Sequence, residues 1–433
     1  MKIKVSKSNL IKFTISLFLV LLIALVCALY GCTSQSSYEW ALETIEKYYV
    51  GGEFDPSLAE EETPQALAKL LDRYSEYYTK EQYEEVIRSN SGEFYGLGVT
   101  LQQVEGAGAM VITVSGNSPA NAAGLEPGDI ITGGEAQGES VTFENYSQFS
   151  EFISARKKSE RFTLKTSEKD YNLSKEIFTQ SYVSMRTKHT GWEFRSSVGG
   201  RLAMIENADK SLDYLPEGAA YVCLSQFFGS AADEFGKVVE KFNSSSMSTL
   251  ILDLRNNGGG YVNVMQSIGG YFVKSASKVG MSAVYKSGRK ENFLCYSHSK
   301  KIGGGAQVYI LANAGTASAS EALIGVLISY GITSFENVFL SDYSNEYLEF
   351  LGEGAKTGQS YGKGIMQSTY TNMRTKEVLK LTSAKIYWPN GKCIHDIGLT
   401  AADGCTLVKT DSVVTKGDRE LMDVIEIIKS RQS

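Results

Sequence analysis

Two short stretches of the chain carry residue types that could act as a nucleophile and its base. In the first, Ala314-Gly315-Thr316-Ala317-Ser318-Ala319-Ser320-Glu321 joins an apolar strand to an amphipathic helix. A serine at such a turn presents its hydroxyl beside free backbone N–H groups and the positive helix end, where an oxyanion can be held. Residues 318–321 also fit a capping box, so a purely structural serine remains an alternative.

The second stretch, Ser360-Tyr361-Gly362-Lys363-Gly364-Ile365-Met366-Gln367, offers a base. Lys363 lies between glycines, which permit close backbone approach, and apolar residues follow it. Burial disfavours the charged ammonium and lowers its pKa, so a neutral amine could take a proton from Ser318. Gln367 could orient that amine. The alternative is a solvated lysine in a loop.

Composition argues against several other classes of function. The 433 residues include 43 Lys and Arg, 49 Asp and Glu and 3 His, a formal charge of -6. An acidic chain without a basic run is a poor nucleic-acid binder. His189, His298 and His395 are widely spaced and form no HExxH pattern, so a zinc site is not expected. The spacing of the cysteines matches no metal motif either.

The first thirty residues have the pattern of a targeting signal. A basic stretch is followed by the apolar run Phe13–Tyr30, which ends at Gly31-Cys32. We interpret 1–31 as a lipoprotein signal peptide and Cys32 as the lipidated residue; an uncleaved membrane helix is the alternative. Either interpretation puts the rest of the chain outside the cytoplasm.

Hydrophobic periodicity predicts how the remaining chain is organised. Helical spacing marks residues 42–49 and 67–74, and Thr79 with Gln82 predicts the capping box of a third helix. Short strands follow, among them 110–114 and 161–165. Beyond residue 180, strands are predicted at 220–224, 249–254 and 307–311. They alternate with a helix that carries Phe235, Val238, Val239 and Phe242 on one face and with a helix that opens near residue 318, and a last helix contains residues 421–428. This alternation predicts an α/β core covered on both faces.

The two chemical stretches together resemble the C-terminal processing peptidases, also called tail-specific proteases. Further segments with the same resemblance occur in the family's order. They are Leu71-Asp72-Arg73-Tyr74-Ser75-Glu76-Tyr77, with Arg73 where proline is usual; Tyr95-Gly96-Leu97-Gly98; Gly124-Leu125-Glu126-Pro127-Gly128-Asp129; Leu252-Asp253-Leu254-Arg255-Asn256-Asn257-Gly258-Gly259-Gly260; and Leu379–Tyr387.

The resemblance implies an α/β multidomain architecture. A helical region at 32–92 would precede a PDZ domain at 93–179 and a peptidase core at 180–433 that resembles the crotonase-like ββα fold. The number of residues that separate Ser318 from Lys363 in the sequence is larger than the family norm, which implies a surface insertion at about 341–356.

The resemblance also implies roles for individual residues. Ser318 is the nucleophile, with Ser320 as its rival, Lys363 is the general base, and Gln367 orients the lysine. The oxyanion-hole donors are the backbone N–H groups of Ala319 and of Gly258 or Gly259. Asp253 and Arg255 would buttress the glycine turn rather than react.

The loop formed by Tyr95, Gly96, Leu97 and Gly98 would bind substrate, because its N–H groups can hold a C-terminal carboxylate while the peptide extends the sheet. The expected protein is therefore a cofactor-independent serine endopeptidase of the bacterial cell envelope that acts on polypeptides with free, apolar C-termini. A homodimer is left open. The alternative is a catalytically inactive, PDZ-containing peptide-binding lipoprotein.

Overall fold

The computed structural model describes residues 35–432 apart from 105, 197–201, 275–276, 352–355 and 411–417. The predicted signal peptide and Cys32 therefore lie outside the described residues. Within the described ranges, no helix combines the length and the apolar character that crossing a bilayer requires.

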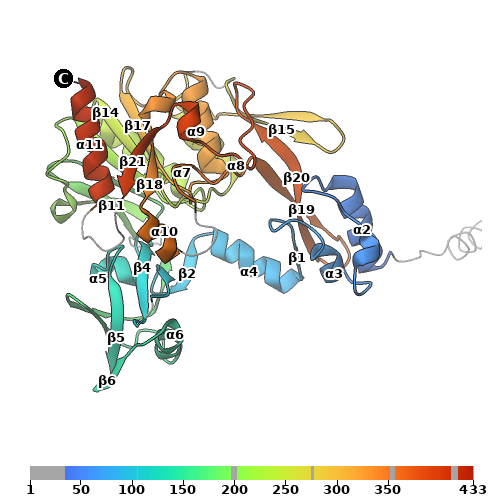
Figure 1. The fold of residues 1–433 in the computed structure, drawn as a ribbon, viewed down its shortest axis with the longest axis horizontal. Helices are drawn as coiled ribbons and strands as arrows, with labels where there is room; N and C mark the ends of the chain where they lie inside the picture. Colours follow the sequence, from blue (N-terminus) through green and yellow to red (C-terminus); the bar gives the residue numbers. More distant parts are fainter. Residues whose placement is uncertain are drawn as a thin grey trace, which may run out of the picture.

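An eight-stranded sheet forms the centre of the larger unit (Figure 1). Its strands are, in spatial order, β12 (Leu202–Asn207), β11 (Gly191–Ser196), β10 (Val183–Arg186), β13 (Ala219–Leu224), β14 (Thr249–Asp253), β17 (Gln307–Ala312), β18 (Val338–Tyr343) and β21 (Thr406–Thr410). The five strands from β13 to β21 are parallel to one another. Parallel strands need helical crossovers, which accounts for the alternation seen in the sequence.

Helices cover both faces of this sheet, as predicted. The helices α7 (Ala231–Ser244), α8 (Val262–Gly270) and α9 (Ala319–Ser329) lie on one face, and α11 (Arg419–Gln432) lies on the other (Figure 1). Side chains of a strand alternate between its two faces. Accordingly Leu250 and Leu252 of β14 pack into the cluster of α7 to α9, whereas Ile251 packs with α11.

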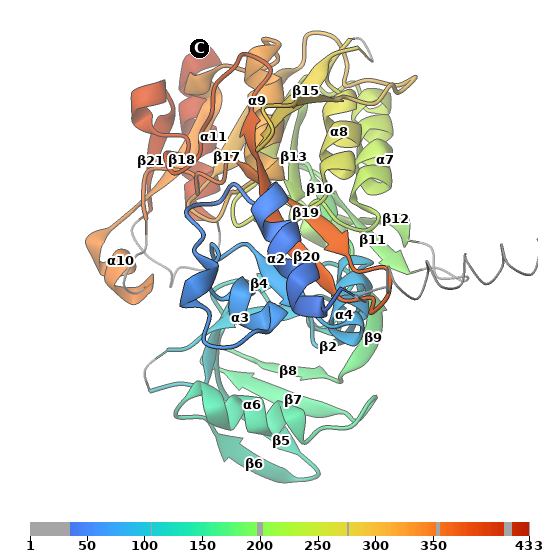
Figure 2. The same ribbon diagram turned by 90° about the vertical axis from the view of Figure 1, so that its right-hand side faces the viewer.

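A second sheet of five strands adjoins the first. The long strand β20 (Val378–Tyr387) pairs with β19 (Ile365–Thr371), with β15 (Val279–Tyr285), which in turn pairs with β16 (Lys290–Leu294), and with β1 (Glu76–Tyr78). The loop that contains Lys363 leads directly into β19, so this sheet positions the lysine. Figure 2 shows β19 and β20 beside α2 (Ser37–Tyr48).

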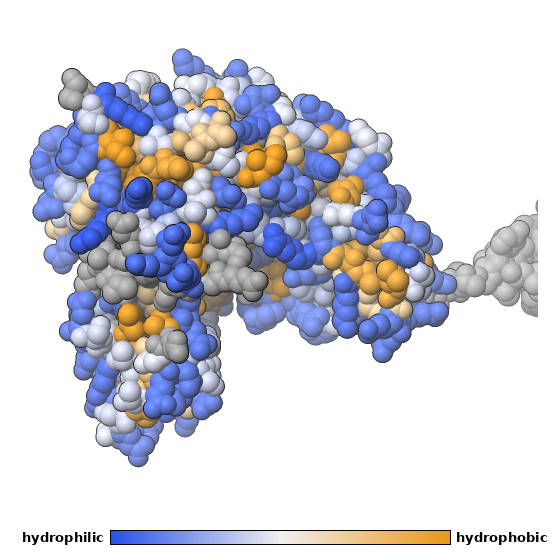
Figure 3. Space-filling model, in the orientation of Figure 1, coloured by the Kyte–Doolittle hydropathy of each residue, from blue (hydrophilic) through white to orange (hydrophobic). Residues whose placement is uncertain are grey.

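The N-terminal segment packs on the second sheet. Ala41 and Ile45 of α2 (Ser37–Tyr48) and Leu67 of α3 (Pro64–Ala68) form one cluster with Leu379 and Leu381 of β20. A short 3-10 turn, Pro56–Leu58, separates the two helices. On the face drawn in Figure 3, apolar side chains gather over this N-terminal region, next to the point where residue 35 begins the described chain.

The smaller unit is built around a separate six-stranded sheet. Its strands are β3 (Val99–Gln102), β4 (Ala109–Val114), β5 (Ile130–Ala136), β6 (Glu139–Thr142), β7 (Phe162–Thr166) and β8 (Asp170–Leu173), with helices α5 (Pro119–Ala123) and α6 (Tyr146–Ser154). It has its own apolar core, which includes Val111, Ile131, Phe149 and Leu164.

The chain enters the smaller unit through β2 (Glu93–Gly96) and leaves it through β9 (Glu176–Thr179), and these two strands pair with each other. The interval 93–179 predicted from the sequence runs from the first residue of β2 to the last residue of β9. Further 3-10 turns lie in the larger unit at Ala208–Lys210, Phe335–Asn337 and Ala401–Asp403.

Most of the predicted elements are present, but the predicted extent of the second helix, 67–74, is wrong. It ends at Ala68, and Tyr74 lies in a turn. The Asp72 carboxylate accepts from the Tyr74 N–H and the Asp72 carbonyl accepts from the Ser75 N–H, so local hydrogen bonds replace the helical ones. The region 32–92 is therefore not purely helical, since β1 follows this turn. The third helix, α4 (Lys80–Asn90), has the predicted capping box of Thr79 and Gln82.

The predicted insertion at 341–356 begins too early. Residues 341–343 are the last three of β18, and Ser341 is fully buried in the large sheet. They pair with β21 as far as Tyr343 and Thr410, so they belong to the core. The segment that follows β18 begins at Ser344 and contains the helix α10 (Asn345–Leu351).

Candidate active site

The turns that follow β14 and β17 meet at one edge of the large sheet. The two strands are parallel neighbours, so their carboxyl ends lie together. The Thr316 hydroxyl donates to the Leu254 carbonyl over 2.8 Å, and the Ala317 N–H donates to the Asn257 carbonyl over 3.0 Å. These bonds fix the serine turn against the glycine turn 258–260.

Ser318 has a backbone conformation that an ordinary helix cap does not need. Its φ is 56° and its ψ is −113°, whereas the cap residues Thr79, Ser118 and Asn145 of this chain are extended. A non-glycine residue in such a conformation costs on the order of 1–3 kcal/mol and persists only where the surroundings hold it. This strain favours a functional serine over a purely capping one.

The two candidate serines differ in their surroundings. The Ser320 side chain is fully buried and its hydroxyl donates to the Asn257 carbonyl over 2.8 Å. Ser318 is partly exposed at the turn. The geometry therefore favours Ser318, because a reacting hydroxyl must be accessible to substrate.

Two backbone N–H groups lie where an oxyanion could bind. Ala319 is the first residue of α9, so its N–H has no partner within the helix. A Cβ added at Gly259 would lie 2.8 Å from the Ala319 nitrogen, which shows how closely the glycine turn approaches. The Gly259 N–H itself donates to Asn257 Oδ1 over 2.9 Å, so it is not available as a donor. Of the two glycines predicted as the second oxyanion-hole donor, only Gly258 therefore remains a candidate. It is exposed and faces open space.

One buried carboxylate joins the serine turn to the lysine loop. Glu321 Oε2 accepts from the backbone N–H groups of both Ser318 and Lys363, each over 2.9 Å. Oε1 accepts from the Gly362 N–H over 2.8 Å and from the Ser360 hydroxyl over 2.5 Å. The backbone nitrogens of Ser318 and Lys363 are therefore at most twice 2.9 Å apart, a separation that a lysine side chain covers easily.

The amine of Lys363 is largely withdrawn from water. Its Nζ lies 4.6 Å from the centre of the Tyr74 ring, a contact made by the N-terminal segment. Desolvation by burial and, second to it, the nearby positive charge of Lys380 lower the pKa of Lys363 to about 8. At neutral pH a usable fraction of the amine is neutral and able to accept a proton.

Gln367 is placed differently from the prediction. Its Nε2 donates to the Thr382 hydroxyl over 3.1 Å, across the β19–β20 pair. Asp253 and Arg255 form part of a buried network instead of facing the serine. The Arg255 Nε donates to both Asp253 oxygens, and the Tyr221 hydroxyl donates to Asp253 over 2.6 Å. Both side chains lie at the end of β14, shortly before the glycine turn in the sequence.

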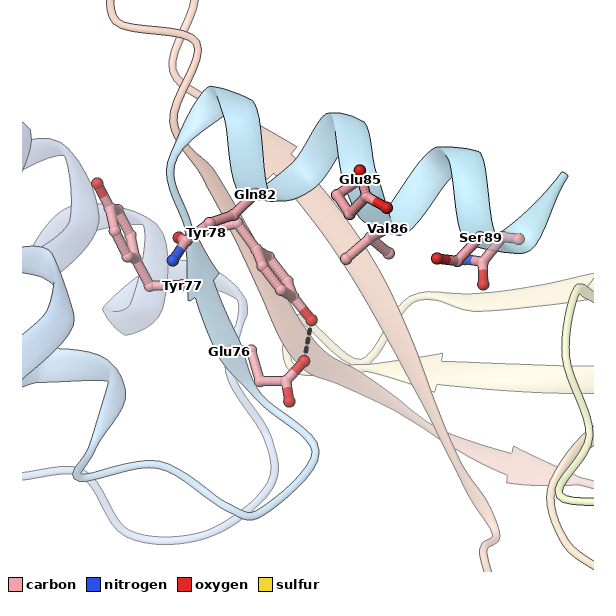
Figure 4. Close-up of a pocket in the computed structure, with 8 residues that line it drawn as sticks. Glu76, Tyr77, Tyr78, Gln82, Glu85, Val86 and Ser89 are labelled. Carbon is pink, nitrogen blue, oxygen red and sulfur yellow. Dashed lines mark hydrogen bonds between the residues drawn. The ribbon is translucent and has the colours of Figure 1, made fainter. Parts of the chain in front are cut away.

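A pocket of about 600 Å³ lies between β1 and α4 (Figure 4). Glu76 and Tyr78 point toward each other across its floor and are hydrogen bonded. Glu76 also forms a salt bridge with Lys380 over 3.1 Å, and the charge of Lys363 contributes to lowering the Glu76 pKa. The pocket is therefore close to the candidate base.

The predicted loop Tyr95-Gly96-Leu97-Gly98 is only partly a loop: Tyr95 and Gly96 are the last residues of β2, and Leu97 and Gly98 connect β2 to β3. Tyr95 is exposed and Leu97 is buried in that unit's core. Gly98 has a φ of 77°, and a Cβ at this position would lie 2.2 Å from the Ser118 Cβ. The Leu97 carbonyl accepts from the Ala120 N–H, which ties the loop to α5.

Sequence reasoning assigned no role at the candidate site to two side chains that the structure places there. Glu321 is expected only as a capping residue, and Tyr74 only as part of a helical pattern and of the family-like segment 71–77. The spacing of Glu321 from Ser318 was a usable signal, because its capping role is the same bond that holds the serine turn. Nothing local to Tyr74 indicates that it would cover Lys363.

None of the four described cysteines forms a disulfide. Cys295 and Cys405 are buried, and Cys223 and Cys393 are partly so. Burial and the nearby Asp253 carboxylate raise the pKa of Cys223 to about 12, so this thiol is inert.

Two solved structures that share the fold are named as proteases. The photosystem II D1 C-terminal processing protease superposes with a TM-score of 0.50 at 18% identity, over 90% of this chain and 95% of that one. The "Putative S41 protease" of Bacteroides fragilis superposes with a TM-score of 0.60 at 14% identity, over 91% and 98%. At these identities the likeness concerns the mixed α/β fold, with its sheet-rich core.

The family resemblance predicted from the sequence is confirmed, since residues 218–334 match the model of Peptidase family S41. The "Probable CtpA-like serine protease" of Staphylococcus epidermidis is 24% identical over 83% of this chain and 63% of its own length. The protein of the same name from Staphylococcus aureus is 27% identical over 76% and 56%. The chain thus spans less than two thirds of the length of these relatives.

Proposed function

We propose that this chain is a serine endopeptidase in which Ser318 attacks the substrate and Lys363 transfers the protons. The observation that carries the proposal is the Glu321 carboxylate. It holds the strained Ser318 and the desolvated Lys363 on neighbouring turns. The names of the S41 relatives support the same reaction class.

The proposed reaction needs only groups of this chain, the peptide and water. Neutral Lys363 takes the Ser318 proton while Oγ bonds to the scissile carbonyl carbon, and the oxyanion accepts from the Gly258 and Ala319 N–H groups. The C–N bond then breaks, and the lysine proton goes to the leaving amine. Water, deprotonated by the same lysine, hydrolyses the acyl-enzyme and restores the serine.

The test compares the full chain with Ser318→Ala, Lys363→Ala and Ser320→Ala on denatured casein and on a peptide with an apolar C-terminus. The first two variants should lose at least about a thousandfold in kcat/KM, because each removes a reacting group. Ser320→Ala is the matched control and should retain activity within about tenfold. A serine-reactive phosphonate should form its adduct on Ser318.

Equal cleavage by the parent and by Ser318→Ala contradicts the mechanism. A parent that binds peptides but neither cleaves them nor reacts with the phosphonate is the inactive peptide-binding lipoprotein considered as the alternative.

We further propose that the smaller unit is a PDZ domain that captures substrate C-termini, and that the larger unit is a crotonase-like core. The first proposal is supported by β3, whose outer edge is unpaired among the described strands, and by the adjoining apolar residues of α6. Amidation of the peptide C-terminus should then raise KM in the assay above. If amidation leaves KM unchanged, the proposal that the smaller unit captures substrate C-termini is wrong.

We also propose that the chain works at the bacterial cell envelope, attached through Cys32 or an uncleaved helix. The basic and apolar pattern of the first thirty residues supports this location. If Cys32 is lipidated, metabolic labelling with radioactive palmitate should mark the full chain and should not mark Cys32→Ser. If the helix is retained instead, neither protein should be labelled, and both should remain in the membrane fraction.

A further inference from the structure

Arg73 is a cation at the candidate active site that tyrosines hold in place. Its guanidinium carbon lies 5.0 Å from the centre of the Tyr74 ring and 5.3 Å from that of Tyr361, and Nη2 donates to the Tyr74 hydroxyl over 2.8 Å. The Tyr74 hydroxyl in turn donates to that of Tyr361 over 2.9 Å. Stacking and hydrogen bonding thus fix an otherwise flexible side chain.

Unlike many arginines of this chain, Arg73 has no carboxylate partner among the described residues. The negative charge of Asp396 acts on it, but no ion pair joins the two side chains, and the Asp396 carboxylate contacts His395. Arginines that do have a carboxylate within salt-bridge distance are Arg88, Arg156, Arg195, Arg255 and Arg289. Arg73 is exposed, so its remaining N–H groups are open to an arriving ligand.

The position of Arg73 relative to Lys363 limits what it could bind. Both cations contact the same Tyr74 ring, so Nζ and the guanidinium carbon are no farther apart than 4.6 Å plus 5.0 Å. Tyr361, the second ring, donates its backbone N–H to the Thr316 carbonyl beside the serine turn. An extended peptide advances about 3.3 Å per residue. A substrate group that binds Arg73 therefore belongs to a residue within about three positions of the scissile bond.

We propose that Arg73 recognises a carboxylate of the substrate close to the scissile bond. A planar guanidinium with free N–H groups matches a carboxylate, which can accept two of its hydrogen bonds. The carboxylate could be an Asp or Glu side chain or the C-terminus of the chain being cut. Arg73 would thus select among substrates without taking part in bond breaking. The inference rests on the proposed function, because it places this carboxylate relative to the cut.

The experiment uses peptide pairs that differ only in charge. Unstructured peptides carry Glu or Gln at each of the three positions on either side of the cleaved bond, and each peptide is made with a free and with an amidated C-terminus. The cleaved bond is located by mass spectrometry. The full chain is compared with Arg73→Gln, Arg73→Lys and Arg73→Glu.

In the parent, kcat/KM should favour the carboxylate member of at least one pair by about three- to tenfold, the range expected for a partly exposed charge pair. Arg73→Gln should bring this ratio to about one, Arg73→Lys should keep part of it, and Arg73→Glu should reverse it. High salt should weaken the preference in the parent. A preference tied to the side-chain pairs or to amidation identifies which carboxylate is bound.

Arg289→Gln is the matched control. Arg289 also stacks on a tyrosine, with its guanidinium carbon 4.3 Å from the Tyr285 ring centre, but it is paired with Glu291 in the β15–β16 hairpin. This variant should keep the parent's ratio. A ratio that is the same in the parent and in Arg73→Gln overturns the inference.

A second measurement separates this inference from the proposed function. The same peptide pairs are titrated by fluorescence anisotropy onto Ser318→Ala and onto Ser318→Ala with Arg73→Gln. If the parent neither cleaves nor reacts with the phosphonate, the proposed function fails. The ratio of the Kd values for the two members of a peptide pair, with and without Arg73, then shows whether Arg73 binds a carboxylate. A parent that cleaves without any Arg73-dependent preference leaves the proposed function intact and rejects carboxylate recognition.

Discussion

The chemistry proposed here depends on one amine that is less basic than an ordinary lysine. Lys363 has this property because Tyr74 covers its Nζ and because Lys380 adds a positive charge nearby. Burial and like charge both disfavour the ammonium form. The acidic groups Asp72 and Glu321 act in the opposite direction, so the pKa of about 8 is a balance.

At the residue scale, we predict a rising limb of kcat/KM near pH 8, because the base works only when neutral. Lys380→Gln removes a positive neighbour and so stabilises the ammonium. The pKa of Lys363 should rise, the limb should move to higher pH, and activity at pH 7 should fall about two- to threefold. The measurement is a pH–rate profile of both proteins.

The control for this prediction is Lys385→Gln. Lys385 is an exposed lysine of the same strand β20, and it is not among the main charges that act on Lys363. Its profile should match that of the parent. A limb that stays in place after Lys380→Gln would mean that the charge of Lys380 does not contribute to lowering the pKa of Lys363.

At the scale of elements, Glu321 connects the start of α9 to the loop that precedes β19. All four groups that bind its oxygens are donors. In Glu321→Gln an NH₂ group would face some of these donors, leaving buried N–H groups unsatisfied. We expect a loss of about 1–3 kcal/mol in the free energy of unfolding and at least a tenfold loss in kcat.

Glu234→Gln separates the two effects. The Glu234 carboxylate is also buried and accepts from the N–H groups of Tyr182 and Val183 and from the Ser230 hydroxyl, but it joins α7 to β10. This variant should lose comparable stability, measured by denaturant unfolding, while kcat stays near the parent value. Equal kcat losses in both variants would show that Glu321 has no special role in aligning the two turns.

At the scale of the whole molecule, a buried charge network ties the C-terminal helix to the end of β14, the strand that the glycine turn follows. Arg255 pairs with Asp253 at the end of β14, and with Asp418 and Glu420 at the start of α11. Glu420 in turn accepts from the Ser341 hydroxyl of β18. Residues at the start of α11 are therefore bonded to the ends of β14 and β18 at this edge of the large sheet.

We predict that Arg255→Met lowers the free energy of unfolding by about 3–5 kcal/mol, because it leaves three carboxylates without their cation. Thermal unfolding of the full chain measures the change. Arg88→Met is the control, since the Arg88–Glu85 pair is exposed and should contribute less than about 1 kcal/mol. Equal melting temperatures for Arg255→Met and the parent would contradict a supporting role for this network.

The sequence by itself determined the features that depend on near neighbours. The alternating strands and helices of the core, the capping box of α4 and the glycine-rich turn after β14 all follow from patterns within about ten residues. Ser318 and Lys363 were identified the same way, from a motif around each.

Only the tertiary structure decided which residues surround these motifs. Tyr74 and Tyr361 are 287 positions apart, yet their hydroxyls are hydrogen bonded beside Lys363. A helical pattern cannot reveal this contact, because β1 reaches β20 only when the N-terminal segment packs on the second sheet. The pKa of an amine depends on the water and charge that packing leaves around it, so the lysine was recognisable in the sequence, whereas its environment was set by the fold.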